Sequence, residues 1–211
     1  DLLRGADARA PVSGGEWEKI VNDADIHCLA PLLYRRLKAT GSLDALPADV
    51  ADRLARRVFG LAARSLVLAE ELRSILQAFE DREVPCAPVR GPALAERLYG
   101  DVTARPSGDL DLLVRKEHLA QVRAILETLG FRHLDRRAGF AQAFSYTLVF
   151  VKDRHGWIVA EPHWTIAYPP FAAALDMEQV WQRMVREQVV GVETWGLVRE
   201  DLLLHLCLHL L

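Results

Sequence analysis

A short segment at residues 108–114, Gly-Asp-Leu-Asp-Leu-Leu-Val, constrains the fold of this chain more than any other part of it. Side chains two residues apart in a β-strand point to the same face. Asp109 and Asp111 would therefore project together, while the leucines that alternate with them would enter a hydrophobic core. The pattern predicts a strand with one buried face and with two neighbouring carboxylates on the other.

Two carboxylates a few ångströms apart repel each other unless a cation lies between them. Divalent cations that prefer oxygen ligands relieve this repulsion, and Mg²⁺ keeps its remaining positions for water and phosphate. Asp109 and Asp111 are therefore candidate ligands of Mg²⁺ or Mn²⁺. An Asp-x-Asp pattern alone is weak evidence, because Asp is common at turns and strand ends.

The residues upstream strengthen this interpretation. A short strand is predicted over residues 84–89, and a helix is expected to start after Arg90. Gly91 lets the backbone approach a ligand closely, and Pro92 suits the first helical position. The open N–H groups at a helix start bind phosphate well. An ordinary tight turn would explain the same residues, but the acids downstream favour a phosphate-binding turn.

A third acid is needed if two metal ions are bound, and Glu161 is the candidate. It lies near the end of a later predicted strand, in Val-Ala-Glu-Pro-His-Trp at residues 159–164. Two metal ions bridged by such a trio of acids would activate an attacking hydroxyl and stabilise a leaving pyrophosphate. Pro162 is typical of an edge strand, so a simple edge-strand charge is the competing interpretation of Glu161. His163 either packs behind the site or touches the substrate.

Hydrophobic periodicity divides the chain into three parts. Residues 1–82 are predicted to form helices, including a long one over 48–81. Residues 83–165 alternate strands and helices, with a helix over 117–129 and strands over 144–151 and 157–164. Residues 166–211 are expected to be helical, over 176–187 and from 199 onward, and both chain ends suggest a fragment of a longer protein. The predicted fold class is α/β (α+β), with helices first and a mixed sheet after them.

The composition limits the classes of binding partner that we expect. The formal net charge is −3 and the basic residues are scattered, so an extended nucleic-acid duplex is not expected. No apolar run has the length of a membrane span and no signal peptide is recognisable, so we expect a cytoplasmic protein without a membrane partner. Cys28, Cys86 and Cys207 have no Cys-x-x-Cys spacing, which favours reduced thiols over disulfides or a zinc site.

Taken together, these motifs resemble the uncharacterised nucleotidyltransferase family of the DNA-polymerase-β superfamily. The resemblance rests on residues 90–101, 105–114 and 161–164, and it extends to Trp17, to residues 31–34 and to residues 200–209. It implies a polymerase-β-like mixed sheet with an N-terminal helical segment and C-terminal helices. It also implies transfer of an NMP from an NTP to a hydroxyl acceptor (a small molecule, a protein or an RNA), with release of pyrophosphate.

The resemblance implies roles for seven residues. The catalytic metal ligands would be Asp109, Asp111 and Glu161, and the nucleotide would be bound by Arg90, Gly91, Arg105 and Gly108. Two features depart from the family pattern. The usual Lys before the glycine is Arg90, which keeps the charge and changes the geometry. The usual Gly-Ser turn is Gly-Pro, so the serine hydroxyl is absent there.

Two other functions fit part of the pattern, and the first stays open. A catalytically weak nucleotide-binding or antitoxin-like protein-interaction module could use the long helix at 48–81 as its interface. A glycosyltransferase also uses Asp-x-Asp, but it needs a βαβ unit before the motif, where this chain is helical. His205 and His209 have the spacing of a metal pair without an accompanying acid, so buried or interface histidines are favoured.

Overall fold

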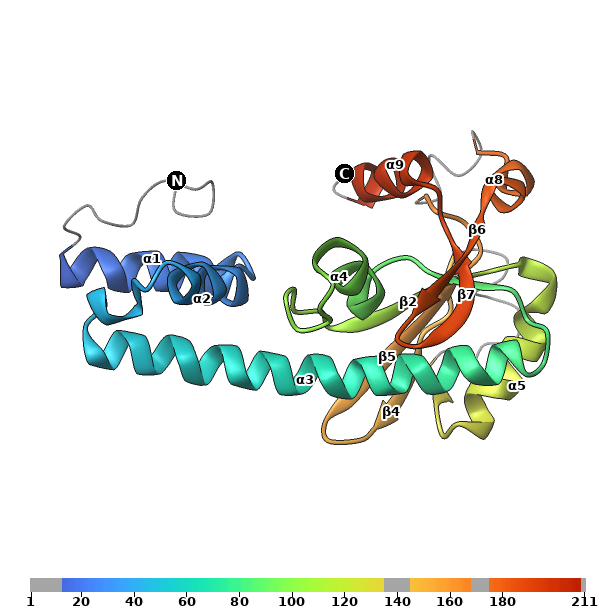
Figure 1. The fold of residues 1–211 in the computed structure, drawn as a ribbon. Coiled ribbons are helices and arrows are strands. Elements are labelled where there is room, and N and C mark those ends of the chain that lie inside the picture. Colours follow the sequence, from blue (N-terminus) through green and yellow to red (C-terminus); the bar gives the residue numbers. More distant parts are fainter. Residues whose placement is uncertain (1–12, 135–144, 168–174, 210–211) are drawn as a thin grey trace.

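The computed structural model describes residues 13–134, 145–167 and 175–209. These residues form a small helical bundle and a mixed α/β body, which are joined by one long helix (Figure 1). The bundle consists of α1 (Gly14–Ile26), α2 (Ala30–Ala39), the 3₁₀ turn η2 (Leu43–Ala45) and the first half of α3 (Ala48–Glu80). The predicted mixed α/β fold with a helical N-terminal part is confirmed.

The bundle follows from local sequence signals. Ser13 caps α1 through a capping box with Glu16, so two backbone N–H groups at the helix start are satisfied. Pro31 stands in the first turn of α2, where its missing N–H does no harm. The buried side chains of the three helices form one cluster around Trp17, which is 2% exposed. This cluster is separate from the core of the α/β body.

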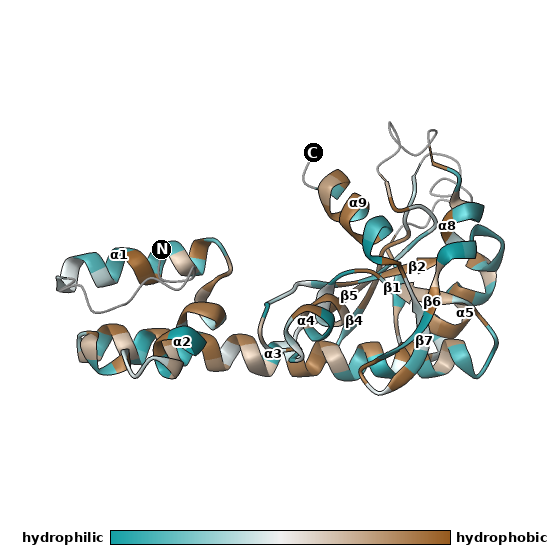
Figure 2. Ribbon diagram, turned by 45° about the horizontal axis from the view of Figure 1, so that its top comes forward, coloured by the Kyte–Doolittle hydropathy of each residue, from teal (hydrophilic) through white to brown (hydrophobic). Residues whose placement is uncertain are grey.

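Helix α3 is 33 residues long and therefore extends about 50 Å at 1.5 Å per residue. Its first half packs against α1 and α2, and residues from Leu68 to Phe79 pack against the sheet. Figure 2 shows hydrophobic residues along the whole helix. The helix consequently contributes to two hydrophobic clusters, one at each end.

The sheet has the strand order β1-β2-β5-β4-β3. Its strands are β1 (Cys86–Pro88), β2 (Asp109–Val114), β3 (Arg132–His133), β4 (Phe150–Asp153) and β5 (Trp157–His163). Strands β2 and β5 are parallel, and the other neighbours are antiparallel. Between the strands lie α4 (Gly91–Tyr99), the 3₁₀ turn η3 (Lys116–His118) and α5 (Leu119–Thr128).

The two faces of the sheet are chemically different. Leu110 and Leu112 of β2 belong to the core under α3 and α5, whereas Leu113 belongs to a second cluster with residues of the C-terminal part. The alternation predicted for residues 109–114 is therefore confirmed. Asp109 and Asp111 share the face of Leu113, because they are four and two residues away from it.

Strand β5 lies inside the sheet, between β2 and β4. The edge position that Pro162 suggested for this strand is wrong. Pro162 is tolerated because its carbonyl oxygen accepts from the backbone N–H of Leu148, and no donor is needed from the proline. The same proline interrupts the ladder, and β4 begins at Phe150. The predicted start of this strand, at residue 144, lies outside the described residues.

The C-terminal part departs from the prediction of helices alone. Helix α8 (Met177–Arg183) ends before 187, and a hairpin of β6 (Val185–Val189) and β7 (Val192–Gly196) precedes helix α9 (Arg199–His209). The turn residues Val190 and Gly191 both have positive φ, 45° and 79°, the combination that joins the strands of two-residue hairpins. In the described part of the chain, no helix is long and apolar enough to cross a membrane.

Candidate active site

The parallel pairing of β2 with β5 brings two acids together. Asp111 and Glu161 are partners in the register, and Asp109 is opposite Val159. Both strands alternate, so Glu161 and His163 lie on one face of β5 while Ile158 and Ala160 enter the core. The predicted grouping of residues from two distant segments is thus present on one face of the sheet.

Asp111 is the most buried acid of the group, with 1% exposure. Its Oδ1 accepts from Nη2 of Arg90 at 2.5 Å and lies 3.0 Å from Nε2 of His163. Burial works to raise the pKa of Asp111, but the hydrogen bond from His163 and the charge of Arg90 outweigh it and hold the pKa below its usual value. The other oxygen, Oδ2, is buried and has no hydrogen-bond partner within the described ranges.

Glu161 and His163 complete a group with ligand-forming geometry. One ligand atom from each of Asp111, Glu161 and His163 lies within 4.8 Å of the others. Burial raises the pKa of Glu161, and the charges of Asp111 and Asp109 add to that rise against the opposing effect of His163. The ring of His163 stacks on Tyr146 at 5.5 Å between centroids. The free oxygen of Asp111 and this donor set fit a divalent cation.

Asp109 precedes Asp111 on the same face of β2, and it is less buried. Burial and then the neighbouring charge of Asp111 raise the pKa of Asp109. Within the described residues, the compact group contains His163 and does not contain Asp109. The role of His163 was left open from the sequence, although its spacing of two residues from Glu161 already placed both side chains on one face.

The turn before α4 has the tight geometry expected of Gly91. Its φ is +67°, and a Cβ atom there would lie 2.9 Å from the backbone oxygen of Asp109. Only glycine fits this close approach, which holds the start of α4 directly against β2. The hydroxyl of Ser107 lies 3.9 Å from the same Cβ position and is buried without a hydrogen-bond partner in the described structure. The sequence alone had not singled out Ser107 as a site residue.

Arg90 links this turn to Asp111. It precedes α4 as the N-cap residue, and its side chain is 15% exposed. Its Nη1 also contacts Nε2 of His209 on helix α9. Arg105 and Gly108 lie in the loop that precedes β2, and Gly108 is exposed.

Helix α9 lies above α4 and the sheet in the view of Figure 1, and two of its histidines reach toward the site. His205 is buried, and its Nδ1 lies 2.8 Å from the backbone oxygen of Ile166. His209 is exposed and contacts Arg90. Burial lowers the pKa of both histidines, and the charge of Arg90 lowers it further in each case. The predicted buried histidine is found at His205, and the spacing of four residues instead brings His209 to Arg90.

Comparisons with known proteins identify the class. The profile of the family described as uncharacterised nucleotidyltransferase matches residues 13–211. The chain therefore belongs to this nucleotidyltransferase family, as its motifs predicted. A comparison with curated proteins gave no match.

Two solved structures of ANT(2″)-Ia are similar to the chain. The crystal structure of ANT(2″)-Ia in complex with adenylyl-2″-tobramycin shows 24% identity over 64% of this chain and 71% of that chain, with a TM-score of 0.43. The solution structure of the antibiotic-resistance factor ANT(2″)-Ia shows 22% identity over 65% of this chain and 69% of that chain, with a TM-score of 0.45.

Proposed function

We propose that this protein transfers an NMP from an NTP to a hydroxyl acceptor, in a reaction that depends on a divalent cation and releases pyrophosphate. The family membership supports transferase chemistry. The observation that carries the proposal is the pairing of Asp111 with Glu161 beside the turn at Gly91. Among the described residues, the buried Oδ2 of Asp111 has no hydrogen-bond partner. A cation site and a phosphate site would then lie next to each other.

Asp111 and Glu161 would hold Mg²⁺ or Mn²⁺, with Asp109 as the third acid on the same face. A bound cation supplies charge neutralisation at the phosphates and lowers the pKa of a bound hydroxyl. His163 holds Asp111 through a hydrogen bond, so the carboxylate keeps its orientation. A ring nitrogen that donates to Asp111 cannot ligate the cation at the same time, so His163 is a positioning residue in this arrangement.

The triphosphate would bind at the start of α4. The first backbone N–H groups of this helix are open donors, and Gly91 allows a close approach. The hydroxyl of Ser107, which has no hydrogen-bond partner among the described residues, would donate to a phosphate oxygen, where the family pattern uses the serine that Pro92 replaces here. Arg90 and Arg105, with the exposed backbone of Gly108, would supply the remaining contacts.

In the reaction, the oxygen of the acceptor hydroxyl attacks the α-phosphorus. The new bond joins that oxygen to phosphorus, and the bond between the α-phosphorus and the bridging oxygen to the β-phosphate breaks. Pyrophosphate leaves with the bonding electrons. The hydroxyl proton passes to the carboxylate of Glu161, which faces Asp111 across the paired strands.

The test is binding and turnover of the four NTPs with and without Mg²⁺, for the wild type and for the double variant Asp109→Ala/Asp111→Ala. We expect NTP binding that requires both Mg²⁺ and the aspartates, and pyrophosphate release once an acceptor is present. EDTA should abolish binding, and added Mg²⁺ should restore it. Absence of NTP binding by a folded wild-type chain would refute the proposal. Ser107→Ala tests the hydroxyl at the phosphate turn, and we expect this variant to bind NTP more weakly.

A second candidate is the protein-interaction module, and one observation favours it. The middle of α3, between its two packed ends, exposes Phe59 by 63% and Leu66 by 56%. Toward both helix ends the outward positions are charged, as at Arg56 and Arg73. An apolar patch on the outward face of a helix is typical of a protein-interaction surface. Charged substitutions at Phe59 and Leu66 leave the acids of the site unchanged. They would weaken the binding of a protein partner and leave NTP binding at the wild-type level.

A further inference from the structure

Arg90 lies where the phosphate turn, the candidate metal carboxylate and helix α9 meet. Its Nη2 donates to Oδ1 of Asp111 at 2.5 Å, and its Nη1 contacts Nε2 of His209. Its Nε is buried and has no hydrogen-bond partner among the residues that the structure describes. The guanidinium is therefore held at two points, by Asp111 from β2 and by His209 from α9.

The ion pair is shielded from water, since the side chains of Arg90 and Asp111 are 15% and 1% exposed. A divalent cation on the free oxygen of Asp111 would stand within a few ångströms of the guanidinium. Like charges at that separation repel strongly in a partly buried site. A cation and Arg90 therefore compete for the single negative charge of Asp111.

We propose that Arg90 is an internal counter-ion that exchanges partners. It neutralises Asp111 while no cation is bound, and it turns to the triphosphate when cation and nucleotide enter. His209 is the positioning residue that holds Arg90 in the first of these arrangements. The inference rests on the proposed function, because it assumes the cation at Asp111 and the nucleotide at Gly91.

The geometry allows the exchange. Arg90 immediately precedes Gly91, so its side chain starts beside the phosphate turn. A guanidinium offers a planar fork of donors that matches a carboxylate and a phosphate equally well. The unpartnered Nε atom adds a donor that the present arrangement does not use and that a phosphate oxygen can accept. Contact with α9 also couples the position of this helix to the occupancy of the site.

The test measures two affinities by calorimetry: that of Mn²⁺ alone, and that of an NTP at saturating Mn²⁺. For Arg90→Gln we expect Mn²⁺ to bind about tenfold more tightly, because its competitor is gone, and the NTP to bind about tenfold more weakly. The shifts have opposite signs. If Arg90 served only the fold, its replacement would weaken the binding of both ligands. Mn²⁺ binding by Arg90→Gln that is equal to or weaker than that of the wild type therefore overturns the inference.

His209→Ala tests whether His209 holds Arg90 in place, separately from the neutralisation of Asp111 by Arg90. Arg90→Lys is the matched control that keeps the positive charge. We expect His209→Ala to bind Mn²⁺ about threefold more tightly and to keep the wild-type affinity for the NTP, because Arg90 is released from His209 but is still present. Arg90→Lys should fall between the wild type and Arg90→Gln. If Arg90→Gln does not fold, His209→Ala decides, and an unchanged Mn²⁺ affinity overturns the inference.

The same measurements distinguish a failure of the proposed function from a failure of the counter-ion role of Arg90. A folded wild type that binds neither Mn²⁺ nor NTP refutes the function and, with it, the exchange. A wild type that binds Mn²⁺ through Asp111, as shown by loss of binding in Asp111→Asn, supports the cation site. If Arg90→Gln then shows no tighter Mn²⁺ binding, only the counter-ion role of Arg90 is refuted.

Discussion

The substitution Gly91→Ala probes the contact between α4 and β2 on which the site depends. Gly91 has a φ of +67°, and an alanine Cβ there would lie 2.9 Å from the backbone oxygen of Asp109. A left-handed conformation costs a non-glycine residue roughly 1–2 kcal/mol. Forcing extra volume into a packed contact costs about 1–3 kcal/mol more, because the backbone oxygen cannot rotate away. We expect a total loss of stability of about 2–5 kcal/mol.

Gly100→Ala is the matched control. Gly100 has nearly the same φ, +66°, and caps the other end of α4, but a Cβ added there meets nothing within 4 Å. This control should lose only the conformational part, roughly 1–2 kcal/mol. The difference between the two variants isolates the steric contact between Gly91 and Asp109.

The measurement is urea denaturation followed by circular dichroism, analysed at equal m-values. Because the alanine pushes α4 away from β2, Gly91→Ala should also weaken NTP binding, while Gly100→Ala should not. Equal losses of stability in the two variants would refute the steric argument. Normal NTP binding by Gly91→Ala would refute the placement of the phosphates at this turn.

Three further predictions concern stability and reactivity. Burial raises the pKa of the Cys86 thiol far above neutral, so a thiol reagent at pH 8 should modify the two exposed cysteines quickly and Cys86 only after denaturation. Replacing both Lys152 and Arg154 with Met should cost about 3–5 kcal/mol in urea denaturation, because Glu71 would stay buried without a partner, and Glu71→Gln should cost clearly less. Ser13→Ala removes the α1 capping box and should cost about 1 kcal/mol of stability, seen as a lower melting temperature.

The sequence predicted strand β2 and helix α3 well, because both have long and regular hydrophobic patterns. It failed at residues 185–189, where a strand follows α8 directly. Apolar residues are sparse in this segment, and Arg186, Glu187 and Gln188 favour a helix as readily as a strand. The strand forms because its hairpin with β7 buries Val189 and Val192 against the core. That contact depends on distant residues and has no local signature.

The site was predictable where strand alternation decides the direction of a side chain. The shared face of Asp109 and Asp111 followed from that rule, and Glu161, which was expected as the third acid, lies opposite Asp111. The contacts of Arg90 with Asp111 and His209 were not predictable, because they depend on how α9 packs over the sheet. The free hydroxyl of Ser107 was missed for a similar reason, since only the fold brings the loop before β2 to the start of α4.

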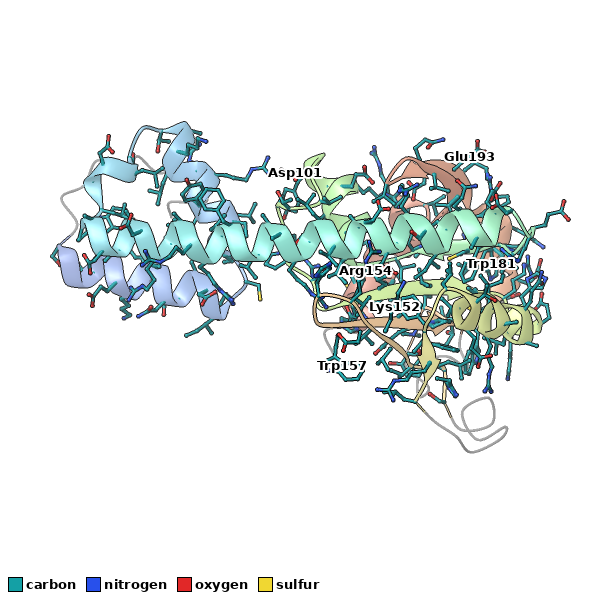
Figure 3. The ribbon with its side chains drawn as sticks, turned by 90° about the horizontal axis from the view of Figure 1, so that it is seen from below. Asp101, Lys152, Arg154, Trp157, Trp181 and Glu193 are labelled. Carbon is teal, nitrogen blue, oxygen red and sulfur yellow. The ribbon has the colours of Figure 1, made fainter. Side chains whose placement is uncertain are left out.

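The long helix α3 also bears on the site, through a buried ion-pair cluster. Glu71 on α3 is 1% exposed, and it accepts from Nζ of Lys152 at 2.9 and 3.1 Å and from Arg154. Figure 3 labels Lys152 and Arg154 beside the long helix. Lys152 lies on β4, and Arg154 lies in the turn between β4 and β5. A slip of one residue in β5 would turn Glu161 to the opposite face of the sheet. By fixing this hairpin against α3, the cluster opposes such a slip and keeps Glu161 opposite Asp111.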